Sequence, residues 1–331
     1  MSTINSRNPS LIDVAKRTDP DGKIAKIVEI LSETNEILNA MPWIECNDGT
    51  THQTTVRTGL PGVTWRKLNY GVQSTKSRTA NVKDSCGMLE AYAKIDKDLA
   101  MLNGNTAAFR LSEDAAFLEA MSQEMATTLF YGDTSVTPEK FMGLVPRFND
   151  STVPSGDNIV DAGGVGSDNT SIWLIVWGDQ NIHGIYPKGS QAGLKHSDLG
   201  EDTTQDENGG EYQILRTHYQ WKCGLTVKDW RYVVRIANVD VNALTKDAAT
   251  GPDLVDLMAH ALELVPNLQR GRAEFYCNRT IKSYLRRQIK NSNNVQISMA
   301  EVAGKHVMFF DEVPVRRCDA ILSSEAAVAF A

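Results

Sequence analysis

The chain has 331 residues, 41% of them hydrophobic and 23% charged, with a net charge of −7 at pH 7. This composition describes a globular protein long enough to bury a large core and to form two or more lobes. No stretch approaches the roughly 20 apolar residues that span a bilayer, and the first residues lack the apolar core of a secretion signal. We therefore expect a protein made and kept in the cytoplasm, and the acidic balance argues against nucleic-acid binding over its whole surface.

The cysteines are odd in number and far apart, which argues against a disulfide framework or a zinc ribbon. We expect reduced thiols, some of them buried, at Cys46, Cys86, Cys223, Cys277 and Cys318.

In chain order, the first element is an amphipathic helix within an extended amino-terminal arm. Between Asp21 and Ala40, apolar residues recur at helical spacing, namely Ile24, Ile27, Leu31 and Leu38.

The segment 51–84 is the most informative part of the sequence. β-forming residues lie on both sides of Asn69-Tyr70-Gly71, so it predicts a long β-hairpin with its turn there. Both faces of the second arm are mostly polar, and an isolated ribbon is only marginally stable in water. The segment carries six basic residues and one acidic residue, a net charge of +5, which leaves −12 for the rest of the chain.

We expect this hairpin to lie on an acidic surface of another subunit. The residues expected at that contact are Arg57, Trp65, Arg66, Lys67, Lys76 and Arg78. The alternative is a solvated surface hairpin whose basic edge discourages aggregation.

A helix is predicted over 112–131, with Ser112 as its N-cap and Gly132 as its C-terminal stop. Its apolar stripe (Phe117, Met121, Met125 and Leu129) is typical of core packing, although it could also line a ligand site. Residues 112–132 contain no Lys or Arg. The expected acidic surface for the hairpin is therefore this helix, through Glu113, Asp114, Glu119 and Glu124.

The middle of the chain holds one strong strand signal, the apolar run 172–177, which is typical of a strand buried on both faces. The acidic stretch 198–211 is interpreted as a loop that is either solvated or subunit-facing. Its order of acidic residues does not match a calcium loop. Further strands are predicted over 212–217, 232–241 and 273–276, helices over 253–264 and 278–290, and a hairpin around Gly304-Lys305.

No catalytic motif can be recognised in the sequence. Gly163-Gly164-Val165-Gly166 precedes a strand, whereas a dinucleotide site follows one, so a flexible connector is the better interpretation. We expect no catalytic, cofactor-binding or metal-binding residues and no cofactor. The competing hypothesis is a cytoplasmic enzyme whose site is assembled from scattered residues such as His183, His218 and Asp319.

Three stretches carry a family resemblance: 58–66 in the hairpin, 112–132 in the long helix, and 313–321 near the carboxyl end. In this order they resemble the major capsid proteins of tailed double-stranded DNA bacteriophages, in particular short-tailed phages. The resemblance implies an α+β protein with the Hong Kong-phage-type capsid fold.

The resemblance also implies a division of the chain. Residues 1–50 would form the amino-terminal arm and 51–95 the extended loop. Residues 96–250 would form the peripheral domain with its spine helix at 112–131, followed by the axial domain at 251–311 and a return to the peripheral domain at 312–331.

The implied function is self-assembly into pentamers and hexamers of an icosahedral head around double-stranded DNA, in the host cytoplasm. Implied partners are other copies of the chain, a portal protein, a separate scaffolding protein, a decoration protein, and packaged DNA through weak non-specific contact, with no membrane. Some relatives crosslink through a lysine of the extended loop. Lys67 and Lys76 are the candidates here, but no acceptor can be identified and we expect no crosslink. An encapsulin-type compartment, which shares the fold and encloses an enzyme, is the alternative.

Overall fold

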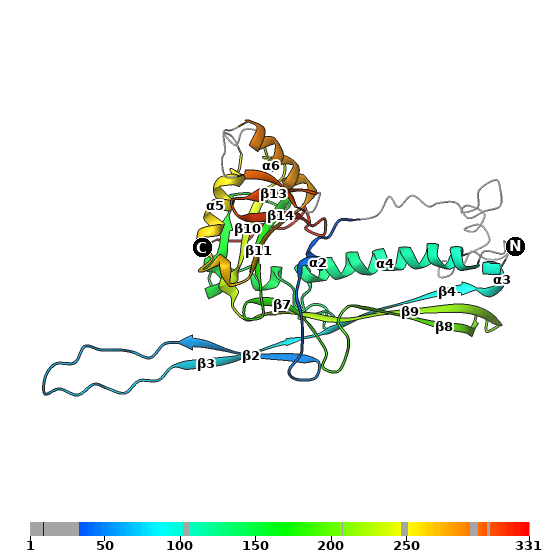
Figure 1. The fold of residues 1–331 in the computed structure, drawn as a ribbon, viewed down its shortest axis with the longest axis horizontal. Helices are drawn as coiled ribbons and strands as arrows, with labels where there is room; N and C mark the ends of the chain where they lie inside the picture. Colours follow the sequence, from blue (N-terminus) through cyan, green and yellow to red (C-terminus); the bar gives the residue numbers. More distant parts are fainter. Residues whose placement is uncertain are drawn as a thin grey trace. The chain divides into compact units, whose positions relative to one another are not determined.

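The computed structural model describes residues 9, 33–101, 106–206, 208–245, 251–291, 297–302 and 305–330. The described chain divides into two compact units (Figure 1). Unit 1 comprises residues 88–127, residues 193–222 and the described residues before 36. Unit 2 comprises residues 36–87, 128–192 and 223–330. The amino-terminal helix expected between residues 21 and 40 lies largely outside the described residues, which include only α2 (Ile37–Ala40). Of the described helices, none is long and apolar enough to cross a membrane.

The sheet of unit 2 is built around β6 (Asn169–Trp177), and all nine of its residues are buried, as predicted for 172–177. The antiparallel strands β10 (Val233–Asp240) and β11 (Arg272–Cys277) flank β6, and β7 (Ile182–Tyr186) pairs with its end. β14 (Val313–Arg317) continues the sheet beside β11 in parallel. A continuous apolar run forms this strand because both of its faces are covered.

One face of this sheet is covered by α5 (Leu254–Leu264) and α6 (Arg279–Asn291), whose apolar residues share a single cluster with β6. Asp253 caps α5 by accepting from two backbone N–H groups, and Asn278 accepts from the Ile281 N–H at the start of α6. Both helices and the strand between them were predicted from sequence, and they are confirmed.

Shorter strands and turns complete unit 2. β1 (Trp43–Glu45) pairs with β7, and β5 (Ile159–Asp161) pairs with β10. β12 (Ile297–Val302) and β13 (Lys305–Phe310) form the predicted hairpin around residues 304–305, and β13 joins β14. Single 3₁₀ turns occur at Val145–Arg147, Pro154–Asn158, Trp230–Tyr232 and Leu268–Arg270.

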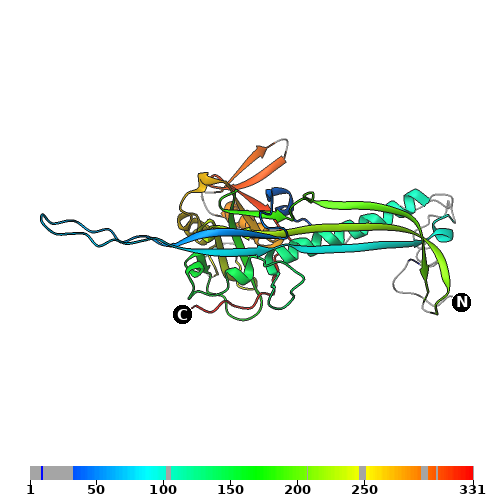
Figure 2. The same cartoon turned by 90° about the horizontal axis from the view of Figure 1, so that it is seen from below.

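The extended hairpin is confirmed, but its paired part is shorter than predicted. β2 (Thr51–Gly59) and β3 (Arg78–Ser85) pair from Thr51–Ser85 to Gly59–Arg78, and 60–77 forms no strand. Gly59 and Pro61 interrupt the β-forming sequence, and Pro cannot donate to a ladder. The end of the ribbon therefore keeps an extended course without regular pairing, as Figure 2 shows edge-on.

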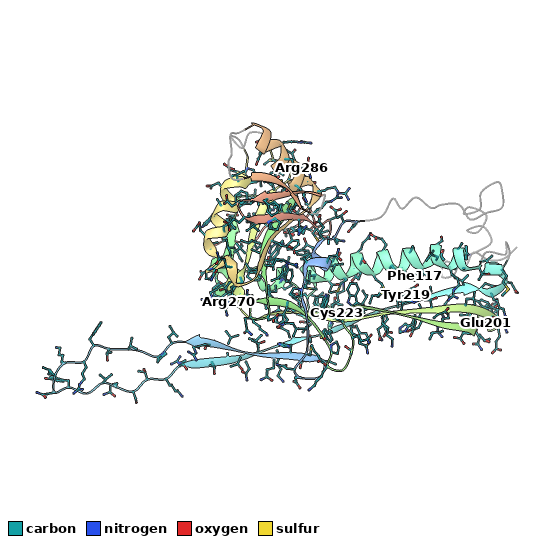
Figure 3. All side chains as sticks on the ribbon, in the orientation of Figure 1. Phe117, Glu201, Tyr219, Cys223, Arg270 and Arg286 are labelled. Carbon is teal, nitrogen blue, oxygen red and sulfur yellow. The ribbon has the colours of Figure 1, made fainter. Side chains whose placement is uncertain are left out.

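Unit 1 contains the long helix and a sheet of long strands. α4 (Thr106–Tyr131), most of which lies in this unit, follows α3 (Lys97–Met101). The sheet is formed by β4 (Gly87–Asp96), β8 (Leu194–Gln205) and β9 (Glu211–Val227). Phe117 of α4 stacks on Tyr219 of β9 with ring centroids 6.1 Å apart (Figure 3). The predicted apolar stripe therefore packs into a core, as Met121 shows by its burial against Ala93 and Tyr219.

The long helix begins at Thr106, six residues before the predicted start, so Ser112 is not its N-cap. Ala107, Ala108, Arg110 and Leu111 are strong helix formers that extend the helix backwards. Phe109 secures this added turn by packing against Ile95 and Ala100. Glu113 and Asp114 consequently lie in the helix interior and not at its positive end. The predicted stop at Gly132 is confirmed, because α4 ends at Tyr131 and the Gly132 N–H makes the last helical bond, to the Thr128 carbonyl over 2.8 Å.

The acidic stretch 198–211 is not a loop, and that prediction was wrong. Residues 194–205 form β8, which pairs with β9 on both sides of an irregularity between Asp198 and Gly200, and the Asp206 N–H donates to the Gly210 carbonyl over 2.8 Å beyond its end. β8 has no buried face, since each of its residues is either exposed or half-buried. Its conformation comes from the partner strand and not from its own propensity.

Candidate intersubunit surfaces

The three most exposed large apolar side chains of the described residues lie at the tip of the extended hairpin, together with two further exposed ones. Trp65 is 102% exposed, Val63 91% and Leu68 89%. The further members of this group are Leu60 and Tyr70. Soluble proteins seldom expose such a group unless it contacts a partner. We call these five residues the tip cluster.

Local contacts shape the turn that carries the tip cluster. Asn69 has a φ of 66°, a left-handed conformation that Asn tolerates better than most residues. The Arg66 Nε donates to the Tyr70 carbonyl over 3.1 Å, and the Thr75 hydroxyl donates to the Gly62 carbonyl over 2.7 Å. The turn lies at 67–70, where the Tyr70 N–H donates to the Lys67 carbonyl over 3.2 Å, so it overlaps the predicted 69–71 but begins earlier. Backbone–side-chain bonds replace a regular ladder there.

The basic residues that the sequence assigned to a contact are all solvent-exposed along the same ribbon. They are Arg57, Arg66, Lys67, Lys76 and Arg78. Exposed charges on a ribbon that offers no core of its own can steer and orient a contact with an acidic surface.

A buried polar cluster anchors the base of the hairpin in unit 2. Asp84, at the end of β3, is 5% exposed, and its carboxylate accepts from Arg147 Nη2 over 2.7 Å and from the Thr226 hydroxyl. His52, the cross-strand partner of Asp84, is also buried and meets His183 of β7 edge-to-face. These contacts fix the root from which the exposed ribbon projects.

The four carboxylates proposed on the long helix do not form an open acidic face. Glu113, Asp114, Glu119 and Glu124 are all half-buried. Glu119 already accepts from the Glu33 backbone N–H and from the Gln123 amide, each over 2.8 Å. The prediction of an exposed acidic face is wrong, because the exposed positions in this part of α4 are instead Leu111, Ala115, Ala116, Leu118 and Ala120.

A more open acidic surface lies on β8 and β9 of unit 1, where the sequence analysis placed a loop. Three of its carboxylates are paired within the unit, Asp198 with Arg110, Glu201 with Lys97, and Asp202 with Arg216. Asp206 and Glu211, at the β8–β9 turn, are exposed. No period of two marks strand β8 in the sequence, because its acidic residues fall at 198, 201 and 202, so local pattern alone could not have identified it.

The residues of the enzyme hypothesis have separate structural roles. His183 is fully buried, its Nδ1 lies 3.3 Å from the Gly178 carbonyl, and burial lowers its pKa to about 4. His218 stacks on Tyr92 of unit 1. Asp319 bridges Arg279 and Arg317 of unit 2.

Comparison with known proteins gives a consistent result. The family described as "Major capsid protein GP7" matches residues 19–329. A solved structure of bacteriophage Epsilon15 is 41% identical, covers 99% of both chains, and superposes with a TM-score of 0.78. No curated protein matches.

A more distant structure shares the fold. The capsid of bacteriophage JBD30 is 8% identical, covers 88% of this chain and 93% of its own, and gives a TM-score of 0.51. The SrpI encapsulin of Synechococcus elongatus is 13% identical over 70% of this chain and 97% of its own, with a TM-score of 0.44. A likeness as weak as the encapsulin's has no bearing on function.

Proposed function

The chain belongs to the major capsid protein GP7 family, and on that premise we propose that its hairpin and tip cluster join neighbouring subunits of the shell. The protein is the major capsid protein of a short-tailed double-stranded DNA phage, with the Hong Kong-phage-type α+β fold. It forms the pentamers and hexamers of the icosahedral head and resides in the virion.

The observation that carries the proposal is the exposure of the tip cluster. A Trp side chain that leaves water completely is among the residues that contribute most to interfaces, commonly 2 kcal/mol or more. The five apolar residues have no core to join within their own ribbon, so a neighbouring subunit is the surface they suit. In a closed lattice many such modest contacts act together.

The basic residues along the ribbon orient the hairpin in this same contact with the neighbouring subunit. We propose that Arg57, Arg66, Lys67, Lys76 and Arg78 face unit 1 of the neighbouring subunit. Two acidic sets there are candidates for the acceptor. One is the α4 set of Glu113, Asp114, Glu119 and Glu124, and the other is the exposed pair Asp206 and Glu211. The second set is more accessible, whereas the first lies on a stretch without any Lys or Arg.

The division of the chain by roles is part of the proposal. Residues 1–50 act as the arm, 51–95 as the extended loop, 96–250 as the peripheral domain with the spine helix, 251–311 as the axial domain and 312–331 as the return. The family resemblance and the order of the elements support this division.

Partners other than the chain itself are also proposed. We propose a portal protein, a separate scaffolding protein and a decoration protein as partners in the head, and weak non-specific contact with packaged DNA. An acidic chain suits an interior that must not hold the entering genome tightly. We propose further that the chain has a structural role without catalysis.

The test is the Trp65→Ala variant, which removes the largest side chain of the tip cluster. We expect a strong loss of closed shells by electron microscopy and a shift toward free subunits or capsomers in sedimentation. The matched control is Val165→Ala, because Val165 is 81% exposed and lies outside the hairpin. The control variant should assemble like the parent.

Folding and assembly can be separated in this experiment. Trp65 is fully exposed in the single chain, so its replacement should leave the thermal unfolding of unassembled protein unchanged. Normal yields of closed shells from Trp65→Ala would reject the tip cluster as a contact.

A further inference from the structure

Two cysteine thiols meet at the base of the extended hairpin. Cys46 directly follows β1, Cys86 directly follows β3, and their Sγ atoms lie 3.4 Å apart. Both backbones are held, because the Cys46 N–H donates to the Tyr186 carbonyl over 2.9 Å and the Cys86 N–H to the Thr50 carbonyl over 3.0 Å. A disulfide needs an S–S distance of about 2.05 Å, so the two sulfur atoms must approach by only about 1.4 Å.

We propose that Cys46 and Cys86 form an intrachain disulfide that closes the base of the hairpin in the released particle. The pair lies just outside the first rung of the β2–β3 ladder, Thr51–Ser85. The bond would tie the open end of the hairpin to β1. It does not depend on which surface of a neighbour the hairpin contacts.

The surroundings of the two thiols favour a late reaction. Burial raises the pKa of both thiols, and at Cys86 the neighbouring Cys46 and Cys223 raise it further, so each is protonated at neutral pH. Because the thiolate is the reacting form, exchange at this site is slow. The reducing cytoplasm keeps such thiols reduced during assembly, whereas particles outside the cell meet oxidising conditions.

The oxidant is a low-molecular-weight disulfide such as oxidised glutathione. The Cys86 thiolate, the less buried of the two, attacks one sulfur of the oxidant and releases one glutathione thiol. The Cys46 thiolate then attacks the Cys86 sulfur of the mixed disulfide and releases the second glutathione. Two protein thiols lose two electrons and two protons, and one disulfide of the oxidant is reduced to two thiols.

The experiment uses assembled shells incubated with oxidised glutathione. They are then denatured without reductant in the presence of N-ethylmaleimide, digested, and analysed by mass spectrometry. We expect a linked peptide pair that joins Cys46 to Cys86, while Cys277 and Cys318 carry the maleimide. Full alkylation of Cys46 and Cys86 would overturn the proposal. So would a bond from Cys86 to Cys223, whose proximity also raises the pKa of Cys86.

A second measurement uses variants. Oxidation should raise the unfolding midpoint of parent shells by a few degrees, and dithiothreitol should reverse the shift, because a disulfide restrains the unfolded chain. Cys46→Ser should show no reversible shift and should retain glutathione on Cys86. Cys223→Ser is the matched control and should behave like the parent. An equal reversible shift in Cys46→Ser would overturn the proposal. If Cys46→Ser fails to fold, the peptide analysis of the parent decides alone.

Discussion

Arg235 and Glu325 form an ion pair in the interior of unit 2, with Nη2 and Oε2 2.9 Å apart and both side chains at most 5% exposed. The same carboxylate accepts from the Ser171 hydroxyl over 2.5 Å and from the Tyr131 hydroxyl. Glu325 also pairs with Asn169 through the backbone. The carboxyl-terminal segment is thereby attached to β6, to β10 and to the end of α4.

Replacing Glu325 by Gln should destabilise the subunit by about 3 kcal/mol or more, because it leaves the Arg235 charge buried without its counter-charge. Urea unfolding of unassembled protein measures the change. Glu312→Gln is the control, because Glu312 is exposed, and its unfolding curve should overlay that of the parent. A loss no larger than that of the control would contradict this account of the ion pair.

Asp84→Asn should weaken the base of the hairpin. The change keeps the shape of the side chain but removes the charge that Arg147 Nη2 contacts over 2.7 Å. We expect a loss of about 2–4 kcal/mol in the free energy of unfolding, together with faster amide exchange in β2 and β3. Asp48→Asn is the control, because Asp48 pairs with Lys83 over 3.7 Å and both side chains are 59% exposed. An equal loss of unfolding free energy in the two variants would show that the burial of Asp84 does not strengthen its ion pair.

The buried His183 predicts a loss of stability in mild acid. Burial is the main cause that lowers its pKa to about 4 from an ordinary value of 6.5, and Lys228 adds to the effect. Between these values the unfolded chain binds a proton that the folded chain rejects, so stability falls as the pH falls from 6.5 to about 4. The contribution is about 3 kcal/mol over that window.

Thermal unfolding at pH 7 and pH 5 tests this prediction in the parent and in His183→Asn, whose amide can still donate to the Gly178 carbonyl. The drop between the two pH values should be smaller in the variant. The buried His52 also has a lowered pKa, so part of the drop should remain. If the thermal stability of the variant fell between pH 7 and pH 5 by as much as that of the parent, His183 would be excluded as the source of the loss.

Charge reversal along the ribbon should impair assembly in a salt-dependent way. For Lys67→Glu with Lys76→Glu, we expect fewer shells at low salt and a smaller deficit at high salt, since screening weakens exposed charges. Light scattering during assembly gives the rate and extent. Lys188→Glu with Lys195→Glu makes the same change in charge at exposed lysines outside the hairpin. If both double variants assembled alike, the charge would act through the whole particle and not through the ribbon.

Local sequence patterns were sufficient to predict the helices and strands whose own residues show a clear apolar pattern. The run 172–177 predicted a doubly buried strand, and the helices predicted over 253–264 and 278–290 begin where Asp253 and Asn278 cap them. The basic hairpin was also evident, because a ribbon with two polar faces and a net charge of +5 is unusual in an acidic chain. Interactions between residues close in sequence decide these features, so the features can be predicted from a single sequence.

Pairing and packing decided what the sequence did not show. β8 is a strand because β9 lies beside it, and α4 begins early because Phe109 packs on Ile95 and Ala100. The exposure of Trp65, the half-burial of Glu119 and the meeting of Cys46 with Cys86 all depend on residues distant in sequence. Local residue patterns thus determined most of the helices and strands, and the family resemblance supplied their capsid-like interpretation. The tertiary structure alone decided which side chains remain available to a neighbour, because burial is a property of the folded surface and not of any local pattern.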